Sequence, residues 1–348
     1  MSARFRSTPD TFTVEEIPAY PPAGAGEHTF VWIEKRGLTT LDAVNLLARR
    51  LGLQARDIGY AGMKDRHATT RQWLSLPRIP PATLLAAEEP AASAGDAAPL
   101  RVLRAESHGN KLRIGHLRGN RFTVVVTDVG GAEEADRLRD EILTLSRVGM
   151  PNRYGDQRFG AGADNAQRGV AILRGESRER DHRRRRLLVS AAQSAVFNAV
   201  LARRQADGSL RRVLPGDVLQ KTDSGGVFVS DDPAVDQARL DAGEVVVTGP
   251  MPGGWAREPP PDTQARTIED EAMAGLGVSR AEFAAVGCDL PGTRRPLLVP
   301  VTAAPETALV YQSESDSARL EFQLPAGVYA TVLLDTVGVT TDTEPRGA

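Results

Sequence analysis

The chain has 348 residues but only one cysteine, Cys288, and five histidines. One thiol excludes intrachain disulfides and any metal site made of several thiolates. The histidines do not occur at a spacing typical of metal ligands, so we expect no metal. No apolar run approaches the roughly 18 residues that a membrane span requires. The first residues also lack the apolar core of a signal peptide, so the sequence predicts a cytoplasmic protein without membrane contact.

Nucleotide-binding fingerprints are missing as well. The sequence contains neither a P-loop nor the glycine-rich pattern of dinucleotide-binding proteins. Together with the lack of metal-ligand clusters, this agrees with a reaction that requires no redox equivalent, metal or nucleotide.

Lysine is scarce, because 39 of the 43 basic residues are arginine. Genome composition alone can produce such a bias. The formal net charge is −2, yet the charge is segregated. Residues 147–212 contain 15 arginines and 6 acidic residues, a net of +9, which leaves −11 for the rest of the chain. Only the basic part of a protein needs to meet phosphate, so this segment predicts contact with nucleic acid.

The most informative segment is residues 59–77, where a turn with two glycines precedes a strand-like run over 72–76. Gly59 and Gly62 permit a tight bend or a close backbone approach. The turn holds Asp65 between Lys64 and Arg66, and cations beside a carboxylate favour its ionised form. An ionised, oriented carboxylate can attack or stabilise a sugar carbon. Taken alone, however, such a triplet is more often a solvated turn.

A longer pattern around this turn resembles a family signature. It matches the signature of the TruD family of pseudouridine synthases at every fixed position, which here reads Ala61-Gly62-x-Lys64-Asp65-x-x-Ala68-x-Thr70-x-Gln72. The resemblance implies that Asp65 is the catalytic aspartate. It also implies tRNA as the partner and no cofactor. No protein partner is implied, and we expect a monomer.

Two further stretches resemble family motifs. The first runs from Arg6 through Phe12 to Glu16, with Arg6 where the family usually has lysine. The second, Gly119-Asn120-x-Phe122, enters a strand. The family ends that strand with arginine, whereas this chain has Thr127, so the role of that arginine is missing or supplied elsewhere. Later matches at 151–160, 190–198 and 324–331 follow in family order.

The hydrophobic pattern predicts an α+β chain. We expect a helix that Thr40 caps and Gly52 ends. Further helices are expected at 133–147, 165–174 and 187–204, and a mobile loop at 86–99. Expected strands lie at 28–34, 72–76, 100–105, 111–116, 121–127, 297–302, 308–312, 318–324 and 328–335.

The resemblance implies more about the fold than the pattern does. It implies a pseudouridine synthase fold with a central mixed, largely antiparallel sheet, formed by residues 1–148 and 299–348. Residues 149–298 would be an inserted α/β TRUD domain, basic at its start, with a cleft between the two domains.

The base of the target uridine must leave its stack, so the site needs aromatic walls and hydrogen-bonding groups. By resemblance, Phe12, Phe122 and Tyr329 are the aromatic candidates, and Asn120 bonds to uracil or orients Asp65. Without the resemblance, phenylalanines at strand starts are usually core residues, and asparagine after glycine is usually a turn residue. Tyr329 replaces a family phenylalanine in the last strand, where its ring stacks or its hydroxyl assists proton removal.

Other residues are expected to support Asp65. Arg6 or Lys64 holds its carboxylate in place, and Glu16 pairs with one of these cations. Structural support and direct chemistry fit Glu16 and Gln72 equally well, whereas His67 is more simply a surface or hinge residue. The sequence leaves open whether Asp65 attacks C1′ of the sugar or removes a sugar proton to give a glycal.

Phosphate contacts are expected from the basic segment, from Arg153, Arg158 and the run Arg183, Arg184, Arg185 and Arg186. Charge runs are usually solvated faces, and pairing such as Glu179 with Arg183 explains part of this one. Its position in the +9 segment favours contact with RNA.

The expected activity is therefore isomerisation of a uridine to pseudouridine, by resemblance uridine-13 in the D arm of tRNA. Two alternatives remain. One is an RNA-binding module without catalysis. The other is a nucleoside or glycoside hydrolase with Asp65 as nucleophile, which requires a second carboxylate, for which Glu16 is the candidate.

Overall fold

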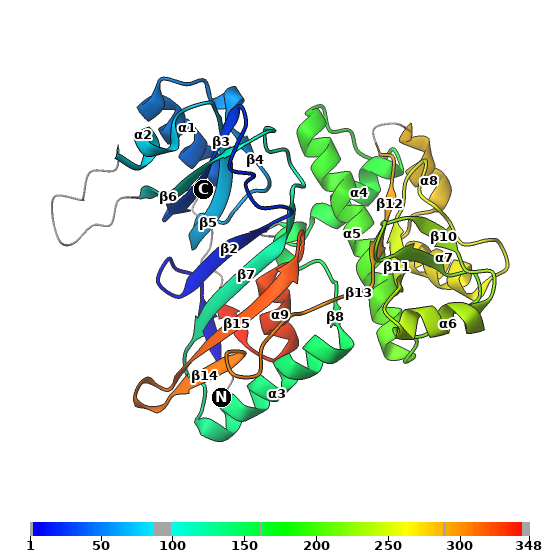
Figure 1. The fold of residues 1–348 in the computed structure, drawn as a ribbon. Coiled ribbons are helices and arrows are strands. Elements are labelled where there is room, and N and C mark those ends of the chain that lie inside the picture. Colours follow the sequence, from blue (N-terminus) through cyan, green and yellow to red (C-terminus); the bar gives the residue numbers. More distant parts are fainter. Residues whose placement is uncertain (1–2, 87–98, 161, 288–289, 343–348) are drawn as a thin grey trace. The chain divides into compact units, whose positions relative to one another are not determined.

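The structure is a computed structural model that describes residues 3–86, 99–160, 162–287 and 290–342. Cys288 and most of the low-complexity stretch 86–99 lie outside the described residues. Contacts divide the chain into two compact units, residues 1–148 with 300–348, and residues 149–299 (Figure 1). Among the described helices, none is both long and apolar enough to cross a membrane.

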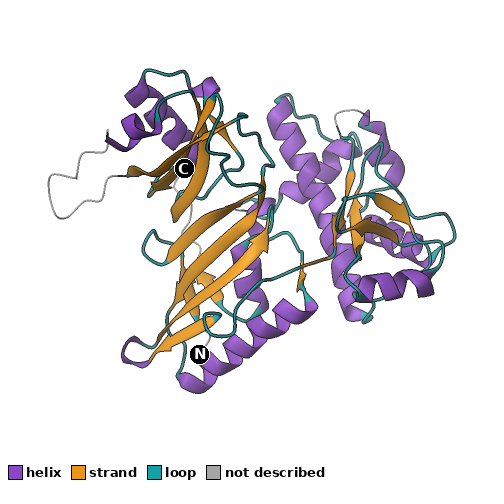
Figure 2. Ribbon diagram, viewed as in Figure 1, coloured by secondary structure: helices purple, strands orange, loops and turns teal. Residues whose placement is uncertain are grey.

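The first unit is built on a large sheet (Figure 2). Its strands are β2 (Phe12–Pro18), β3 (His28–Lys35), β4 (Gly59–Tyr60), β5 (Thr69–Pro77), β6 (Leu100–His108), β7 (Leu117–Val126), β14 (Leu309–Gln312) and β15 (Ser317–Pro325). The order is β14-β15-β7-β2-β5-β3-β6, with β4 beside β5. Only β2 and β5 run parallel, and every other neighbouring pair is antiparallel. The predicted mixed, largely antiparallel sheet is confirmed.

Smaller elements complete the first unit. The strands β1 (Arg4–Arg6) and β16 (Thr340–Asp342) form a separate parallel pair. The helices are α1 (Thr40–Leu51), α2 (Pro81–Ala86), α3 (Ala132–Val148) and α9 (Ala330–Thr336).

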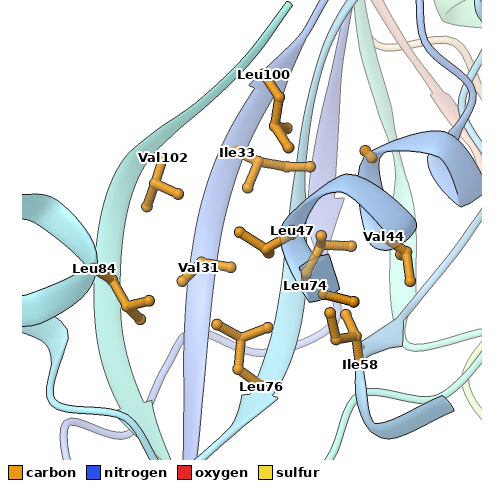
Figure 3. Close-up of a cluster of buried hydrophobic side chains, with 12 residues drawn as sticks. Val31, Ile33, Val44, Leu47, Ile58, Leu74, Leu76, Leu84, Leu100 and Val102 are labelled. Atoms are coloured by element: carbon orange, nitrogen blue, oxygen red, sulfur yellow. The ribbon is translucent and has the colours of Figure 1, made fainter. Parts of the chain in front are cut away.

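Helix α1 covers β3 and β5 with its apolar stripe. Val44 and Leu47 of α1 are in one buried cluster with Ile33 of β3 and Leu74 of β5 (Figure 3). Burial of such side chains is the main stabilising contribution to folding, about 1.5–3 kcal/mol for each large apolar group. The cluster fixes α1 against β3 and β5, and the start of α1 meets the Asp65 turn where Thr40 accepts the N–H of Lys64.

The start of α1 differs from the prediction by one residue. Thr39, not Thr40, is the N-cap, because Asp42 lies three positions after Thr39 and closes a reciprocal capping box with it. Gly52 ends the helix as predicted, in a left-handed conformation with φ of 66°. Thr40 is thereby freed to turn its hydroxyl toward the sheet, where it is fully buried.

Two predicted strands of the first unit are wrong. Residues 111–116 form a loop, and β7 begins only at Leu117. Residues 330–336 form α9, whose Ala330, Val332 and Leu333 are all buried. A short apolar run that is buried on several sides has no helical stripe, so periodicity cannot tell it from a buried strand.

The second unit is an α/β unit around a four-stranded sheet. Its strands are β9 (Val218–Lys221), β10 (Val227–Val229), β11 (Val245–Met251) and β12 (Thr293–Pro296), in the order β10-β9-β11-β12. A separate antiparallel pair joins β8 (Met150–Pro151) to β13 (Leu298–Val299). The helices are α4 (Asn165–Leu173), α5 (His182–Ala206), α6 (Pro233–Asp241), α7 (Gln264–Gly275) and α8 (Arg280–Ala285).

Helix α5 organises this unit. Phe197 and Leu201 pack against Val247 of β11 in its largest apolar cluster. The helix starts at His182 rather than at 187, because the Asp181 side chain caps it by accepting the N–H groups of Arg183 and Arg184. The arginine run therefore lies inside α5 and not before it.

Candidate active site

Asp65 lies in an exposed turn between β4 and β5. Its Oδ1 accepts the N–H of His67 at 2.9 Å, which is the self-bonding turn that Asp forms readily. This bond fixes the orientation of the carboxylate relative to its own backbone. The carboxylate is thus both presented to solvent and held in one direction.

The turn is anchored from the sheet side by Gln72 and Thr40. Gln72 on β5 donates from Nε2 to the carbonyl oxygen of Gly62 at 3.2 Å. Thr40 accepts the N–H of Lys64 at 2.8 Å and donates to Oε1 of Gln72 at 3.0 Å. Gln72 and Thr40 are fully buried, so these bonds do not compete with water. The predicted supporting residue Gln72 contacts the turn directly.

Glu16 and Lys64 form a buried ion pair below the turn. Lys64 Nζ lies 2.8 Å from Glu16 Oε2, and the side chains of Lys64 and Glu16 are 3% and 1% exposed. Glu16 also accepts the N–H of Trp73 at 3.3 Å. Burial raises the pKa of Glu16, and the neighbouring Lys64 opposes that rise. A pair removed from water in this way fixes geometry more reliably than it adds stability.

The cations that flank Asp65 in sequence are directed to other groups. Lys64 pairs with Glu16, and Arg66 donates from Nε to the carbonyl oxygen of Gly37 at 3.0 Å. The Lys64 ammonium thus bonds to the Glu16 carboxylate and the Arg66 guanidinium to the main chain at Gly37. That Arg6 or Lys64 holds the Asp65 carboxylate in place stays a prediction.

Lys35 is a supporting residue that the sequence motifs did not indicate. It ends β3, is completely buried, and donates from Nζ to the carbonyl oxygens of Leu38 and Asp65 at 2.6 and 2.9 Å. Burial lowers the pKa of Lys35 to about 8, while the charge of Asp65 acts in the opposite direction. One signal was available, because Lys35 is among only four lysines in an arginine-rich chain.

Arg6 lies at the end of β1, exposed, in a segment that runs along the same turn. Ser7 donates to the carbonyl oxygen of His67 at 3.2 Å, and Thr69 donates to that of Pro9 at 2.6 Å. The predicted basic residue is thus close in the fold to the residues that follow Asp65. His67 takes part through its backbone, in agreement with a hinge or surface position.

Phe12 and Phe122 lie in a buried stack of rings. The two rings are nearly parallel, with centroids 6.0 Å apart. Phe322 stacks on Phe122 from the other side, and Phe5 meets Phe12 edge-on. In β2 and β7, Val14 faces Phe122 and Glu16 faces Asn120, so these residues share the face of the sheet that carries the ion pair. The structure therefore gives both phenylalanines a core role as well as a position beside Glu16.

Asn120 has an unusual environment. Its Oδ1 is buried and has no hydrogen-bond partner among the described residues. An acceptor buried without a partner costs about 1–3 kcal/mol, so such atoms in native proteins call for an explanation. Gly119, just before it, carries no side chain because a Cβ there would lie 2.2 Å from the carbonyl oxygen of Leu324.

Tyr329 is not on a strand. It precedes α9 as its N-cap residue, after a turn in which Gly327 has φ of 78°, and it is 47% exposed. Its ring is outside the stack that the described phenylalanines form. An exposed ring is available to a ligand, whereas the buried rings of Phe12 and Phe122 are mainly packed against each other.

The arginines predicted to meet RNA belong to the second unit, where they differ in exposure. Arg158 donates from Nε to Ser194 at 3.1 Å and also bonds to Ser190, and its guanidinium lies 5.5 Å from the ring centroid of Tyr154. Arg153 is half-buried. These two arginines are thus partly engaged within their own unit.

The run at the start of α5 is more open. Arg183, Arg184 and Arg186 are exposed and Arg185 is half-buried. Glu179 pairs with Arg184 at 3.3 Å rather than with Arg183. Cations in the first turn of a helix oppose its dipole, so local helix stability does not explain four arginines there.

Among the described residues, no group of three or more histidine, cysteine, aspartate or glutamate side chains is arranged to hold a metal ion.

Comparison with known proteins gives consistent results. The sequence model of the family described as tRNA pseudouridine synthase D (TruD) matches residues 1–180 and 178–337. The tRNA pseudouridine synthase D of Anaeromyxobacter dehalogenans (strain 2CP-C) is 42% identical over 335 residues, covering 94% of this chain and 91% of the relative. The protein of that name from Thermus thermophilus is 38% identical, covering 97% of this chain and 89% of the relative.

A solved structure has a similar fold. The crystal structure described as tRNA pseudouridine synthase D from Methanosarcina mazei matches with a TM-score of 0.75 at 23% identity, over 97% of this chain and 94% of that one. At this identity the match supports the fold, and the predicted fold class is confirmed.

Proposed function

The chain belongs to the TruD family of tRNA pseudouridine synthases, and from that premise we propose that it acts on uridine-13 of the tRNA D arm with Asp65 as the reacting carboxylate. The isomerisation of uridine to pseudouridine in tRNA is the activity of the protein. This reaction breaks the glycosidic bond, turns the base, and rejoins it through carbon.

One observation carries the assignment of Asp65. Its turn is hydrogen-bonded from the sheet side at Gly62, Lys64 and Asp65 itself, by Gln72, Thr40 and Lys35. A reacting group must be held within a fraction of an ångström to gain the full advantage of proximity. This chemistry needs an exposed carboxylate on a firmly held backbone. A turn that is merely solvated would not need such support.

Two routes use this carboxylate. Asp65 either attacks C1′ and forms a covalent bond to the sugar, or removes a sugar proton to give a glycal. Both require the same position next to the ribose of a flipped-out uridine. We assign Glu16, Lys64, Gln72, Arg6 and Lys35 to the support of Asp65. The Glu16 side chain is only 1% exposed and bonds to Lys64, so it is not presented to a substrate as the second carboxylate of a hydrolase would be.

We assign recognition of the uracil base to Asn120, Phe12, Phe122 and Tyr329. The unpaired Oδ1 of Asn120 would accept the N3–H of uracil, which gives that buried atom the partner it lacks. The exposed ring of Tyr329 would stack on the base, and Phe12 with Phe122 would form the apolar floor.

Residues 1–148 and 299–348 would then be the catalytic domain, with the TRUD domain inserted as residues 149–298. The exposed arginines Arg183, Arg184 and Arg186 would contact tRNA phosphates, with Arg153, Arg158 and Arg185 in support. We expect a cytoplasmic protein, because its substrate is cellular tRNA, and we expect it to act as a monomer.

The experiment is position-resolved mapping of pseudouridine in a tRNA transcript incubated with the purified protein. We expect modification at position 13, no release of free uracil, and no requirement for an added cofactor. Modification at another position would refute the site assignment, and free uracil would indicate a hydrolase. Binding without either product would indicate a module that lacks catalysis.

A further inference from the structure

A cavity in the first unit is unrelated to any residue assigned above. It has a volume of about 430 Å³ and is lined by His28, Asn110, Lys111, Arg113 and His116. All five side chains are polar and two of them are permanent cations, whereas none is acidic. A cavity with this lining favours an anion. We call it the cationic pocket.

Neighbouring side chains fix the two histidines that line the cationic pocket. His28 opens β3 and faces His108 at the end of β6. His116 shares a 2.6 Å hydrogen bond with the hydroxyl of Tyr20, and the ring of Tyr20 stacks on His108 with centroids 5.2 Å apart. These contacts hold the imidazole groups in place, so that binding an anion would need little ordering of the side chains.

The loop that carries the cations is also fixed. Leu112 is buried and donates its N–H to the buried Oγ of Ser75 at 2.9 Å. Lys111 donates to the carbonyl oxygen of Arg56 at 2.6 Å, which engages one of its three N–H donors and leaves its charge uncompensated by that contact. Gly59 must lack a side chain here, because a Cβ would lie 2.4 Å from the carbonyl oxygen of Leu112.

The same loop is bonded to the segment that leads to Asp65. The N–H of Gly115 donates to the carbonyl oxygen of Ala61 at 2.9 Å, and Ala61 precedes Asp65 by four residues. Four residues span at most about 14 Å, which a few nucleotides of RNA can cover. Beside the cations, Ile114 is 77% exposed, and Met63 on the Asp65 turn is 59% exposed. Exposed apolar side chains among fixed cations suit a ligand that has both phosphates and flat bases.

We propose that the cationic pocket binds a phosphodiester of the substrate RNA close to the flipped-out uridine, with Lys111 and Arg113 as the charged contacts. This inference rests on the tRNA activity of the family, and it adds a phosphate contact on the catalytic unit to the arginines of the inserted one. Arginine and lysine supply most contacts to nucleic-acid phosphates, which fix the register of the strand without reading its sequence. Such a contact would add to the affinity of the catalytic unit for tRNA.

The test compares tRNA affinity over a salt series for the full chain and two double variants. Lys111→Gln with Arg113→Gln removes the two proposed contacts. Arg49→Gln with Arg50→Gln is the matched control, because these two exposed arginines at the end of α1 carry the same charge. Arg113→Gln alone is added, since this exposed side chain can be changed without unfolding the loop.

We expect the pocket variant to flatten the slope of log K against log salt by about 0.7–0.9 for each phosphate that it no longer neutralises. KM for tRNA should rise while kcat at saturating tRNA stays close to wild type, and the control should retain the wild-type slope. A slope unchanged in both pocket variants, or an equal change in the control, would overturn the proposal.

Two further experiments are added. The first distinguishes an RNA phosphodiester from free phosphate as the bound anion, and the second distinguishes a failure of this proposal from a failure of the proposed chemistry. Inorganic phosphate is added as a competitor at constant ionic strength. If the pocket variant changes inhibition by phosphate but not the tRNA slope, the pocket binds a free anion and the proposal is wrong. The binding series is repeated in the Asp65→Asn background, so that a failure of the proposed chemistry leaves the pocket result readable.

Discussion

Two buried lysines, Lys35 and Lys64, lie behind the Asp65 turn and have different partners. Lys64 has a carboxylate partner in Glu16, whereas the acceptors of Lys35 are two main-chain carbonyl oxygens. A buried ammonium without a carboxylate contact is expensive to maintain. We therefore interpret Lys35 as a positioning residue, which holds the backbone of Asp65 and contributes positive potential below its carboxylate.

Replacing Lys35 with methionine should test this role. The change keeps the length of the side chain but leaves the carbonyl oxygens of Leu38 and Asp65 without their donor. We expect kcat to fall by about ten- to a hundredfold, as for a reacting group displaced by a fraction of an ångström. Lys221→Met, an exposed lysine of β9, is the control and should retain full activity. Wild-type kcat in a folded Lys35→Met protein would contradict the positioning role.

The depressed pKa of Lys35 predicts a pH dependence of stability. Its pKa is about 8 in the folded protein and 10.5 in the unfolded chain, so the unfolded chain binds more protons between these values. The free energy of unfolding of wild type, measured relative to Lys35→Met, should therefore rise as the pH increases from 8 to 10.5. Denaturant titrations at several pH values check this, and a difference that falls over that range would contradict it.

Tyr329 permits a separate test of base recognition. Stacking on a base is worth about 1–3 kcal/mol, so Tyr329→Ala should lose far more activity than Tyr329→Phe. The ring is exposed, so neither change should unfold the protein. Turnover of both variants at saturating tRNA is the measurement. Equal, severe losses would mean that the hydroxyl takes part in the chemistry and that stacking is not the main contribution.

At the scale of elements, the start of α5 is positively charged, which opposes the helix dipole but attracts phosphate. Asp181 caps the helix, and the following turn carries only cations in its charged positions. The opposite end of the same helix has Arg203, with Arg212 shortly after it, both exposed. Arg183 with Arg186, and Arg203 with Arg212, are thus two exposed pairs of equal charge near opposite ends of α5.

A pair of double variants separates the two ends. Arg183→Gln with Arg186→Gln should weaken tRNA binding without changing which uridine is modified, because phosphate contacts do not read the sequence. Its salt slope should flatten by about 0.7–0.9 for each phosphate left without its arginine. Arg203→Gln with Arg212→Gln should leave the slope nearly unchanged. If the salt slope stays at the wild-type value in both double variants, the arginine run is only a solvated helix end and RNA binds to another surface.

The elements also show what the sequence could predict. The alternation in β3 and the capping signals around α1 depend on neighbours in the chain, and these predictions are correct to within a residue. Helix α5 begins at His182, five residues before the predicted start, because a run of arginines has no apolar periodicity. Asp181 was the available capping signal. The predicted last strand is wrong because Ala330, Val332, Leu333 and Leu334 are buried on several sides of a helix, which depends on tertiary packing.

At the scale of the whole molecule, the sheet brings together segments that are far apart in the chain. Glu16 from β2, Gln72 from β5 and Asn120 from β7 lie on neighbouring strands, and Lys64 joins them from the turn. The motif identified Asp65 because its signature is local in sequence. Thr40 and Lys35 could not be found in that way, because their contacts with the turn depend on how α1 and β3 pack against it.

The most direct test of the role of Asp65 is Asp65→Asn. Asparagine is isosteric and its Oδ1 can still accept the N–H of His67, so the turn should persist while the negative charge is lost. Asp140→Asn, an exposed aspartate of α3, is the matched control. Single-turnover pseudouridine formation is measured together with tRNA affinity and the free energy of unfolding.

We predict no detectable product from Asp65→Asn, with affinity and stability close to wild type, and full activity in the control. Turnover within about tenfold of wild type, which corresponds to a loss of less than about 1.4 kcal/mol of transition-state stabilisation, would contradict the role of Asp65 as the reacting group.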